Sequence, residues 1–299
     1  MVRLLRNSVI AVLILAAIYF VFLRVEMRSR LLAPAHYPQG DWSELAMLHG
    51  QDLSIPEPDG NHLDAWWIPA WQAQRTVVFF HSRAGNITDQ DERVLRFRAL
   101  DSNVLMADYS GYGKSGGQAS LNSIFTDGEA VYQYAVRQLH LPPARIVLDG
   151  DELGSAVAAW LAARHPAVGA LVLESPFPSF RAWGDSILPL GGWFLPEPAS
   201  TINDVRRYSG PKLILYGTRD QDLPAALSQA VYASASAPKF QQVVPDGTQA
   251  HLVLDAGDSY VAWMRQFYLD AHLTHQTPAA PQGMPTMRIL REQPVKSAH

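Results

Sequence analysis

The sequence contains no cysteine in its 299 residues. A disulfide framework and a thiolate metal site are therefore both excluded. The sequence also lacks an excess of either charge, since 24 Lys and Arg face 28 Asp and Glu and the net charge is −4. This balance gives no reason to expect nucleic acid as a partner. The hydrophobic fraction of 48% is ordinary for a globular protein, so one large domain with a substantial core is expected.

Charged residues are also absent from residues 7–23, between Arg6 and Arg24. This run is at the lower limit of length for crossing a hydrocarbon core of about 30 Å. It ends in Phe-Val-Phe-Leu rather than in the small residues of a signal-peptide cleavage site. We interpret residues 1–30 as an uncleaved membrane anchor; a signal peptide with an unusual cut and a buried core helix are the alternatives. Because arginines flank both ends, the charges favour neither orientation in the membrane.

Beyond the anchor, short apolar runs alternate with segments of helical periodicity. Near-continuous apolar runs are typical of strands buried on both faces of a parallel sheet. They occur at 76–81, 103–108, 145–150, 169–174, 211–216 and 240–245. Two shorter runs, 53–55 and 63–68, flank a Pro-Asp-Gly-Asn turn and predict an antiparallel hairpin. The alternation predicts an α/β fold with a mostly parallel central sheet flanked by helices.

The same alternation sets the expected domain organisation. One α/β domain is predicted over residues 31–272, with its last helix over 252–272. Residues 176–210 are rich in Pro, Gly and Trp and too long for a simple connection, so they are expected to form a small lid. From residue 273 onward, prolines and mixed polar residues predict a disordered tail.

The segment 145–160 combines a strand, a tight turn and an alanine-rich helix. Gly150 and Gly154 are spaced as in a nucleophile elbow, the Gly-x-nucleophile-x-Gly turn that raises one side chain above the edge of the sheet. The residue between them, where a serine hydrolase has its serine, is Glu152. The sequence therefore predicts the backbone of an elbow without the usual hydroxyl.

These residues resemble the α/β-hydrolase fold, and more narrowly the membrane-anchored serine hydrolases of the serine aminopeptidase group, which include protein depalmitoylases. The resemblance covers roughly residues 30 to 270. Its landmarks are Trp66-Trp-Ile-Pro69, His81-Ser-Arg-Ala-Gly-Asn86, Asp108-Tyr-Ser-Gly-Tyr-Gly-Lys-Ser-Gly116, Gly150-Asp-Glu-Leu-Gly154, Glu174-Ser-Pro-Phe177, Gly217-Thr-Arg-Asp220 and His251. The resemblance implies descent from an ester or thioester hydrolase, with an ester, thioester or acylated molecule as substrate and the lipid bilayer as partner.

The resemblance also implies a catalytic order of nucleophile, acid and histidine. The matching positions are Glu152, Asp220 and His251, with Asp222 as a second choice for the acid. An oxyanion hole would use the backbone N–H of Leu153 and that of Ser82 or Arg83. The family has Gly-Asn at the last two positions, so Ser82 and Arg83 are departures at the loop that must approach the substrate.

Glu152 leaves three hypotheses open. A carboxylate has no O–H for His251 to remove, so the first is a fold without ordinary serine-hydrolase activity, in which Glu152 could pair with protonated His251. The second is a carboxylate nucleophile, as fold relatives use an aspartate there. The third is hydrolysis by another residue or by a differently aligned elbow. Ser155 is the nearest candidate but falls in the first turn of the helix, and Ser115 and Ser175 are more plausible as loop residues. We predict no cofactor and no metal at this site.

Overall fold

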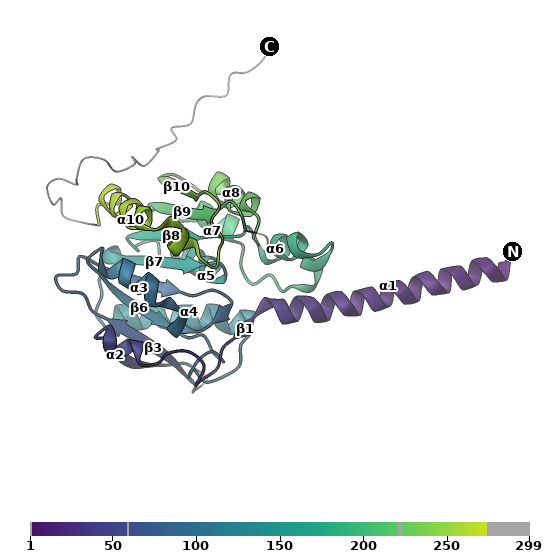
Figure 1. Cartoon of the computed structure of the whole chain (residues 1–299), viewed down its shortest axis with the longest axis horizontal. Helices are drawn as coiled ribbons and strands as arrows, with labels where there is room; N and C mark the ends of the chain where they lie inside the picture. Colours follow the sequence, from purple (N-terminus) through teal and green to yellow (C-terminus); the bar gives the residue numbers. More distant parts are fainter. Residues whose placement is uncertain (1, 59, 221–222, 274–299) are drawn as a thin grey trace, which may run out of the picture.

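The computed structural model describes residues 2–58, 60–220 and 223–273. It shows an eight-stranded sheet with strand order β10-β9-β8-β7-β4-β6-β3-β2 and with helices on both faces (Figure 1). The strands are β2 (Gln51–Pro56), β3 (His62–Ile68), β4 (Arg75–Phe80), β6 (Ser102–Ala107), β7 (Ile146–Asp151), β8 (Ala170–Glu174), β9 (Lys212–Gly217) and β10 (Lys239–Val244). Only the pairings of β3 with β2 and with β6 are antiparallel, so the predicted hairpin and the mostly parallel sheet are confirmed.

The helices follow the predicted alternation. They are α1 (Val2–Leu31), α2 (Glu44–Met47), η1 (Ile87–Gln90), α3 (Asp91–Arg98), α4 (Leu121–Arg137), η2 (Pro143–Arg145), α5 (Leu153–Arg164), α6 (Phe180–Ile187), η3 (Gly191–Phe194), α7 (Thr201–Arg207), α8 (Ala225–Ser234), α9 (Leu252–Ala256) and α10 (Asp258–Asp270). Two further two-residue strands, β1 (Ala33–Pro34) and β5 (Ala84–Gly85), pair in parallel.

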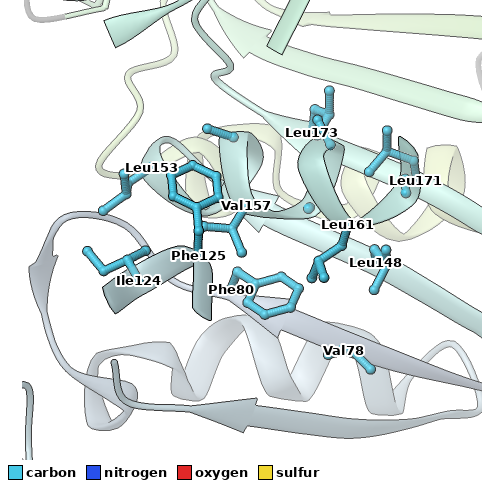
Figure 2. Packing of buried hydrophobic residues seen from close by; sticks show 14 of the residues in the cluster. Val78, Phe80, Ile124, Phe125, Leu148, Leu153, Val157, Leu161, Leu171 and Leu173 are labelled. Atoms are coloured by element: carbon cyan, nitrogen blue, oxygen red, sulfur yellow. The ribbon is translucent and has the colours of Figure 1, made fainter. Parts of the chain in front are cut away.

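Alternate residues of the central strands serve two separate cores. Successive side chains of a strand point to opposite faces, so Val78 and Phe80 pack on one face of β4 while Val77 and Phe79 pack on the other. Figure 2 shows the first core, in which side chains of the strands meet those of α4 and α5: Val78, Phe80, Leu148, Leu171 and Leu173 against Ile124, Phe125, Leu153, Val157 and Leu161. The second core is formed with α3 and α10. Burial on both faces explains why these strands are apolar throughout.

The single helix predicted over 252–272 is wrong in one respect. The chain forms two helices, α9 and α10, which are separated at Gly257. Gly257 has φ 54°, a left-handed conformation that glycine adopts without the penalty of a Cβ atom. A helix commonly ends at such a residue. The apolar pattern therefore runs on from α9 into α10, although the helix itself is interrupted at Gly257.

Helix α1 extends away from the sheet (Figure 1). Its stretch Arg6–Glu26 is long and apolar enough to cross a membrane, and very little of it is buried within the described chain. Of the predicted tail, only Leu273 is among the described residues.

Candidate active site

Glu152 occupies the turn between β7 and α5 with φ 52° and ψ −105°. A non-glycine residue with positive φ is uncommon and is found where the surroundings enforce it. Here two glycines make the turn possible. A Cβ atom on Gly150 would lie 2.1 Å from the carbonyl oxygen of Gly154, and one on Gly154 would lie 1.9 Å from that of Phe80. The backbone of a nucleophile elbow is therefore present at the predicted residue.

The carboxylate of Glu152 is buried and is held by Arg83. Its Oε1 accepts a hydrogen bond from Arg83 Nε at 2.7 Å, and its Oε2 accepts one from the backbone N–H of Arg83 at 3.1 Å. That N–H is one of the predicted oxyanion donors, so the carboxylate takes up a donor that a reacting carbonyl would need. Burial raises the pKa of Glu152, while the Arg83 guanidinium and the two hydrogen bonds oppose the rise.

Arg83 in turn connects the elbow to the last turn of α1 and to the segment that follows it. Its Nη1 donates to the carbonyl oxygen of Arg30 at 3.0 Å, and its own carbonyl accepts from Ala33 N at 2.9 Å and from the Tyr112 hydroxyl at 2.7 Å. The strand pair β1–β5 continues this contact. The pairing matters because it brings the chain directly after the anchor against the predicted oxyanion loop.

These contacts leave little space beside Glu152. The void at the elbow measures about 10 Å³, roughly the room needed by one water molecule. It is lined by Leu31, Arg83, Glu152, Leu153, Phe177, Phe180 and Trp183. The Arg83 guanidinium lies 5.4 Å from the centre of the Trp183 ring. Glu152 is thus buried at the elbow, and Leu31 and Arg83 are among the residues that line the small void beside it.

The predicted acid and histidine have different surroundings. Asp220 is close enough for its charge to raise the pKa of Glu152, and its carboxylate accepts hydrogen bonds from the backbone N–H of Leu223, at 2.8 Å, and of Gln249. His251 is exposed at the start of α9. Within residues 60–220 and 223–273, Glu152 forms its ion pair with Arg83 and not with His251. Asp222 lies outside the described residues.

His251 faces a second, larger pocket of about 300 Å³, which it shares with Ser82. The remaining walls include Arg93, Asp151 and Gln249. Thus Glu152 and Asp220 are brought near each other at the elbow, together with Arg83 and Leu153. His251 and Ser82 border the neighbouring pocket.

Two of the three other candidate serines, Ser155 and Ser115, form structural hydrogen bonds through their hydroxyl groups. Ser155 Oγ donates to the carbonyl oxygens of Gly150, at 2.6 Å, and Glu174, at 2.8 Å. Ser115 Oγ donates to the carbonyl oxygen of Asp108 at 2.7 Å, and Ser175 is buried. Ser155 therefore ties the first turn of α5 to two neighbouring strands.

Sequence reasoning missed a buried group of charges beneath the elbow. Arg93 of α3 pairs with Asp151, at 3.3 Å, and with Glu174. Glu174 also accepts from the Tyr260 hydroxyl at 2.7 Å, and Gln249 Nε2 donates to Asp151 at 3.0 Å. Burial raises the pKa of Asp151 to about 7 although Arg93 opposes it. Two acidic residues that end adjacent buried strands were the available signal, because Asp151 and Glu174 are register partners.

Comparison with known proteins agrees with this architecture. The family described as serine aminopeptidase, S33, matches residues 72–202. The α/β hydrolase domain-containing protein WAV2 of Arabidopsis thaliana is 31% identical over 73% of this chain and 78% of its own. The chain belongs to the serine aminopeptidase-like group of α/β-hydrolases.

Other members of this α/β-hydrolase group are also similar to the chain. Protein bem46 of Schizosaccharomyces pombe is 26% identical over 85% of this chain and 89% of its own, and the uncharacterized protein YfhR of Escherichia coli K12 is 31% identical over 74% and 81%. Among solved structures, the Pyrococcus furiosus esterase Pf2001 aligns with a TM-score of 0.69 at 17% identity, covering 80% of this chain and 98% of the esterase. The predicted family and fold are thereby confirmed.

Proposed function

We propose that this α/β-hydrolase is a membrane-anchored protein without ordinary serine-hydrolase activity. One observation carries the proposal: the carboxylate of Glu152 stands at the elbow and accepts the backbone N–H of Arg83. A serine hydrolase needs a hydroxyl that a base can deprotonate, and preformed N–H donors that await the developing oxyanion. The Glu152 side chain affects both requirements, because it replaces the hydroxyl and accepts a hydrogen bond from one of the N–H donors.

The energetic consequence can be bounded. Loss of one oxyanion donor typically costs about 3 kcal/mol of transition-state stabilisation. A substrate carbonyl would have to displace the Glu152 carboxylate from Arg83 to regain that donor, and the ion pair at 2.7 Å opposes this displacement.

Glu152 as a carboxylate nucleophile is the alternative function. It would attack an electrophilic carbon with one oxygen and form an ester that water then hydrolyses. Both oxygens are hydrogen-bonded to Arg83, and the void beside them is about 10 Å³. These contacts favour the non-hydrolytic reading, because attack requires an accessible lone pair and a near-attack geometry.

The anchor is the second part of the proposal. The apolar stretch Arg6–Glu26 lies outside the folded domain and is mostly exposed. Exposing so much contiguous apolar surface to water is unfavourable, and the helix is long enough to cross a bilayer. We therefore place α1 in a membrane, with the sheet domain at its surface and an ester, thioester or acylated molecule as the ligand class that the family relationship suggests.

Activity-based labelling tests the catalytic part. The full chain in phospholipid nanodiscs is exposed to a fluorophosphonate probe and to p-nitrophenyl esters of increasing acyl length. We expect no labelling and no turnover above the empty nanodisc. The triple variant Ser82→Gly, Arg83→Asn, Glu152→Ser restores the residues typical of the family and is expected to be labelled. The same variant with His251→Ala tests whether that histidine is the base.

Labelling of the parent chain would contradict the proposal. Incorporation of solvent ¹⁸O into the Glu152 carboxylate during ester turnover would establish the carboxylate nucleophile instead. Recovery of the chain in the soluble fraction without detergent, or a mature N-terminus beyond residue 24, would contradict the anchor.

A further inference from the structure

The segment between α6 and α7 contacts the membrane-spanning part of α1. We call residues 188–196 the lid tip. The rings of Phe194 in the lid tip and Phe20 in α1 meet edge to face, with centroids 4.6 Å apart. The Tyr19 hydroxyl also donates to the carbonyl oxygen of Pro189 at 3.4 Å. The lid tip is therefore seated on the stretch of α1 that we place in the bilayer.

The position of the Phe20–Phe194 contact along α1 determines how deep the contact would lie in the bilayer. Phe20 lies six residues before Glu26, the end of the apolar stretch, and an α-helix rises about 1.5 Å per residue. The contact is thus roughly 9 Å along the helix from Glu26, whereas the headgroup layer on each side of a bilayer is about 5–7 Å thick. An upright α1 would carry the lid tip into the leaflet from which it emerges.

The side chains exposed on the lid tip suit that environment. Leu190 is 62% exposed and Trp193 is 71% exposed. Tryptophan is enriched at membrane–water interfaces, where its ring and N–H match an environment that is partly apolar and partly wet. The Arg181 guanidinium lies 5.0 Å from the centre of the Trp193 ring, so a cation stands beside the apolar tip at the level where lipid phosphates would lie.

The acidic residues near the lid tip are occupied in folding it. The Asp185 carboxylate accepts from the Gly192 N–H at 3.0 Å. Glu197 accepts from the N–H groups of Phe180 and Arg181, both at 3.0 Å, at the start of α6. These carboxylates hold the tip in shape.

A groove of about 810 Å³ runs between α1, the lid tip and the start of α4. Its walls are mostly apolar and include Phe20, Leu31, Trp193 and Phe194, with Arg24 at one side. Leu31 also lines the void beside Glu152. Since one wall of the groove is the membrane-spanning helix itself, lipid would fill the groove on the side that faces the bilayer.

We propose that the lid tip inserts into the membrane leaflet that contains the C-terminal end of α1, with Leu190 and Trp193 among lipid chains and headgroups. The proposal rests on the anchoring of α1 given above, and it adds a second membrane contact from the hydrolase domain. It orients the domain on the bilayer so that the groove, and behind it Leu31 and Glu152, face lipid.

Absence of natural cysteine makes the depth of single positions measurable. Full-length single-cysteine variants Leu190→Cys and Trp193→Cys are labelled with the fluorophore NBD and reconstituted in phosphatidylcholine vesicles that contain nitroxide lipids. Trp71→Cys is the matched control, because Trp71 is 87% exposed but precedes β4, which runs parallel to β7. Trp71 therefore lies near the strand ends opposite to those that carry the elbow. Leu15→Cys, within the apolar stretch of α1, reports on the anchor.

We expect nitroxides near the headgroup to quench probes at 190 and 193 several-fold more strongly than the probe at 71, and aqueous iodide to show the reverse order. Quenching at 190 and 193 equal to that at 71, with position 15 strongly quenched by deep nitroxides, would overturn the inference and leave the anchor standing. Protection of 190 and 193 from both lipid nitroxides and iodide would overturn it in favour of a protein contact. An unquenched probe at position 15 would overturn the anchor and the inference together.

Discussion

At the turn between β7 and α5 the backbone keeps the geometry of a hydrolase elbow, whereas polar groups of the loops around it are engaged in hydrogen bonds within the protein. The turn is held by contacts that the core requires, since Gly154 packs directly on the carbonyl of Phe80 and Ser155 bonds to two strands. The Arg83 loop instead binds the elbow carboxylate, and Asp220 binds backbone N–H groups. Core packing therefore preserves the backbone of the elbow, which we call the frame of the site, whether or not the site performs hydrolysis.

The largest effect should come from the frame itself. A Cβ atom on Gly154 would lie 1.9 Å from a backbone oxygen, so Gly154→Ala must separate β4 from α5. We expect a loss of about 4 kcal/mol or more in the free energy of unfolding, or no folded protein. Gly116→Ala is the control, because its nearest contact would be the Asn61 side chain at 3.3 Å. Equal urea midpoints for the two variants would show that the elbow is not enforced by packing.

The buried charges beneath the elbow should rank next. Arg93→Met leaves Asp151 and Glu174 without their cation, and breaking a buried pair in this way costs about 3 kcal/mol or more. Arg96→Met is the control, since Arg96 pairs with Glu92 at a partly exposed helix surface and should cost less than about 1 kcal/mol. Chemical unfolding measures both variants. Similar losses of unfolding free energy would show that the buried charges beneath the elbow stabilise the protein no more than a pair at the surface does.

The loss caused by Arg93→Met should also depend on pH. The pKa of Asp151 is already raised by burial to about 7, and it rises further when the cation is removed. The folded variant then binds a proton that the unfolded chain releases, so its stability falls as pH increases. The difference between parent and variant should therefore be larger at pH 8 than at pH 6. A difference that shrinks toward pH 8 would mean that Asp151 is not the group left unpaired.

The ion pair between Glu152 at the elbow and Arg83 in the adjacent loop should contribute less to the free energy of unfolding than the buried charges do. A double-mutant cycle of Glu152→Gln and Arg83→Met isolates the ion pair at 2.7 Å. We expect a coupling of about 1–2 kcal/mol, as for neighbouring residues that share hydrogen bonds. Thermal unfolding of the four proteins in the same detergent measures it. Additive losses would mean that Arg83 does not hold Glu152, and the burial of its carboxylate would need another explanation.

The smallest effect is expected at His251. Its side chain is exposed, so His251→Ala should change the free energy of unfolding by less than about 0.5 kcal/mol. The next residue, Leu252, is buried in the second core, and Leu252→Ala should cost about 2–5 kcal/mol. A loss above about 1 kcal/mol for His251→Ala would indicate that this histidine bonds within the site and that the surroundings resemble a working triad more closely.

The elbow was predictable because its signals are local. Gly150, Glu152 and Gly154 stand within five consecutive residues, and the apolar run before them marks the strand. The partner of Glu152 was not predictable from spacing. Arg83 was named only as a possible oxyanion donor, and its side-chain contact depends on β4 and β7 lying side by side. The pairing of β1 with β5 was missed for the same reason, since a two-residue strand carries no periodic pattern.

From the sequence alone come the α/β alternation, the apolar α1 and a glutamate at the elbow, because hydrophobic periodicity and glycine spacing act over a few neighbouring residues. Tertiary structure decided that Arg83 neutralises Glu152, that Arg93 lies beneath Asp151 and that the lid tip rests on α1. Each of these contacts joins segments far apart in the chain. Their energies depend on burial and on distances between side chains, which exist only once the sheet has brought the segments together.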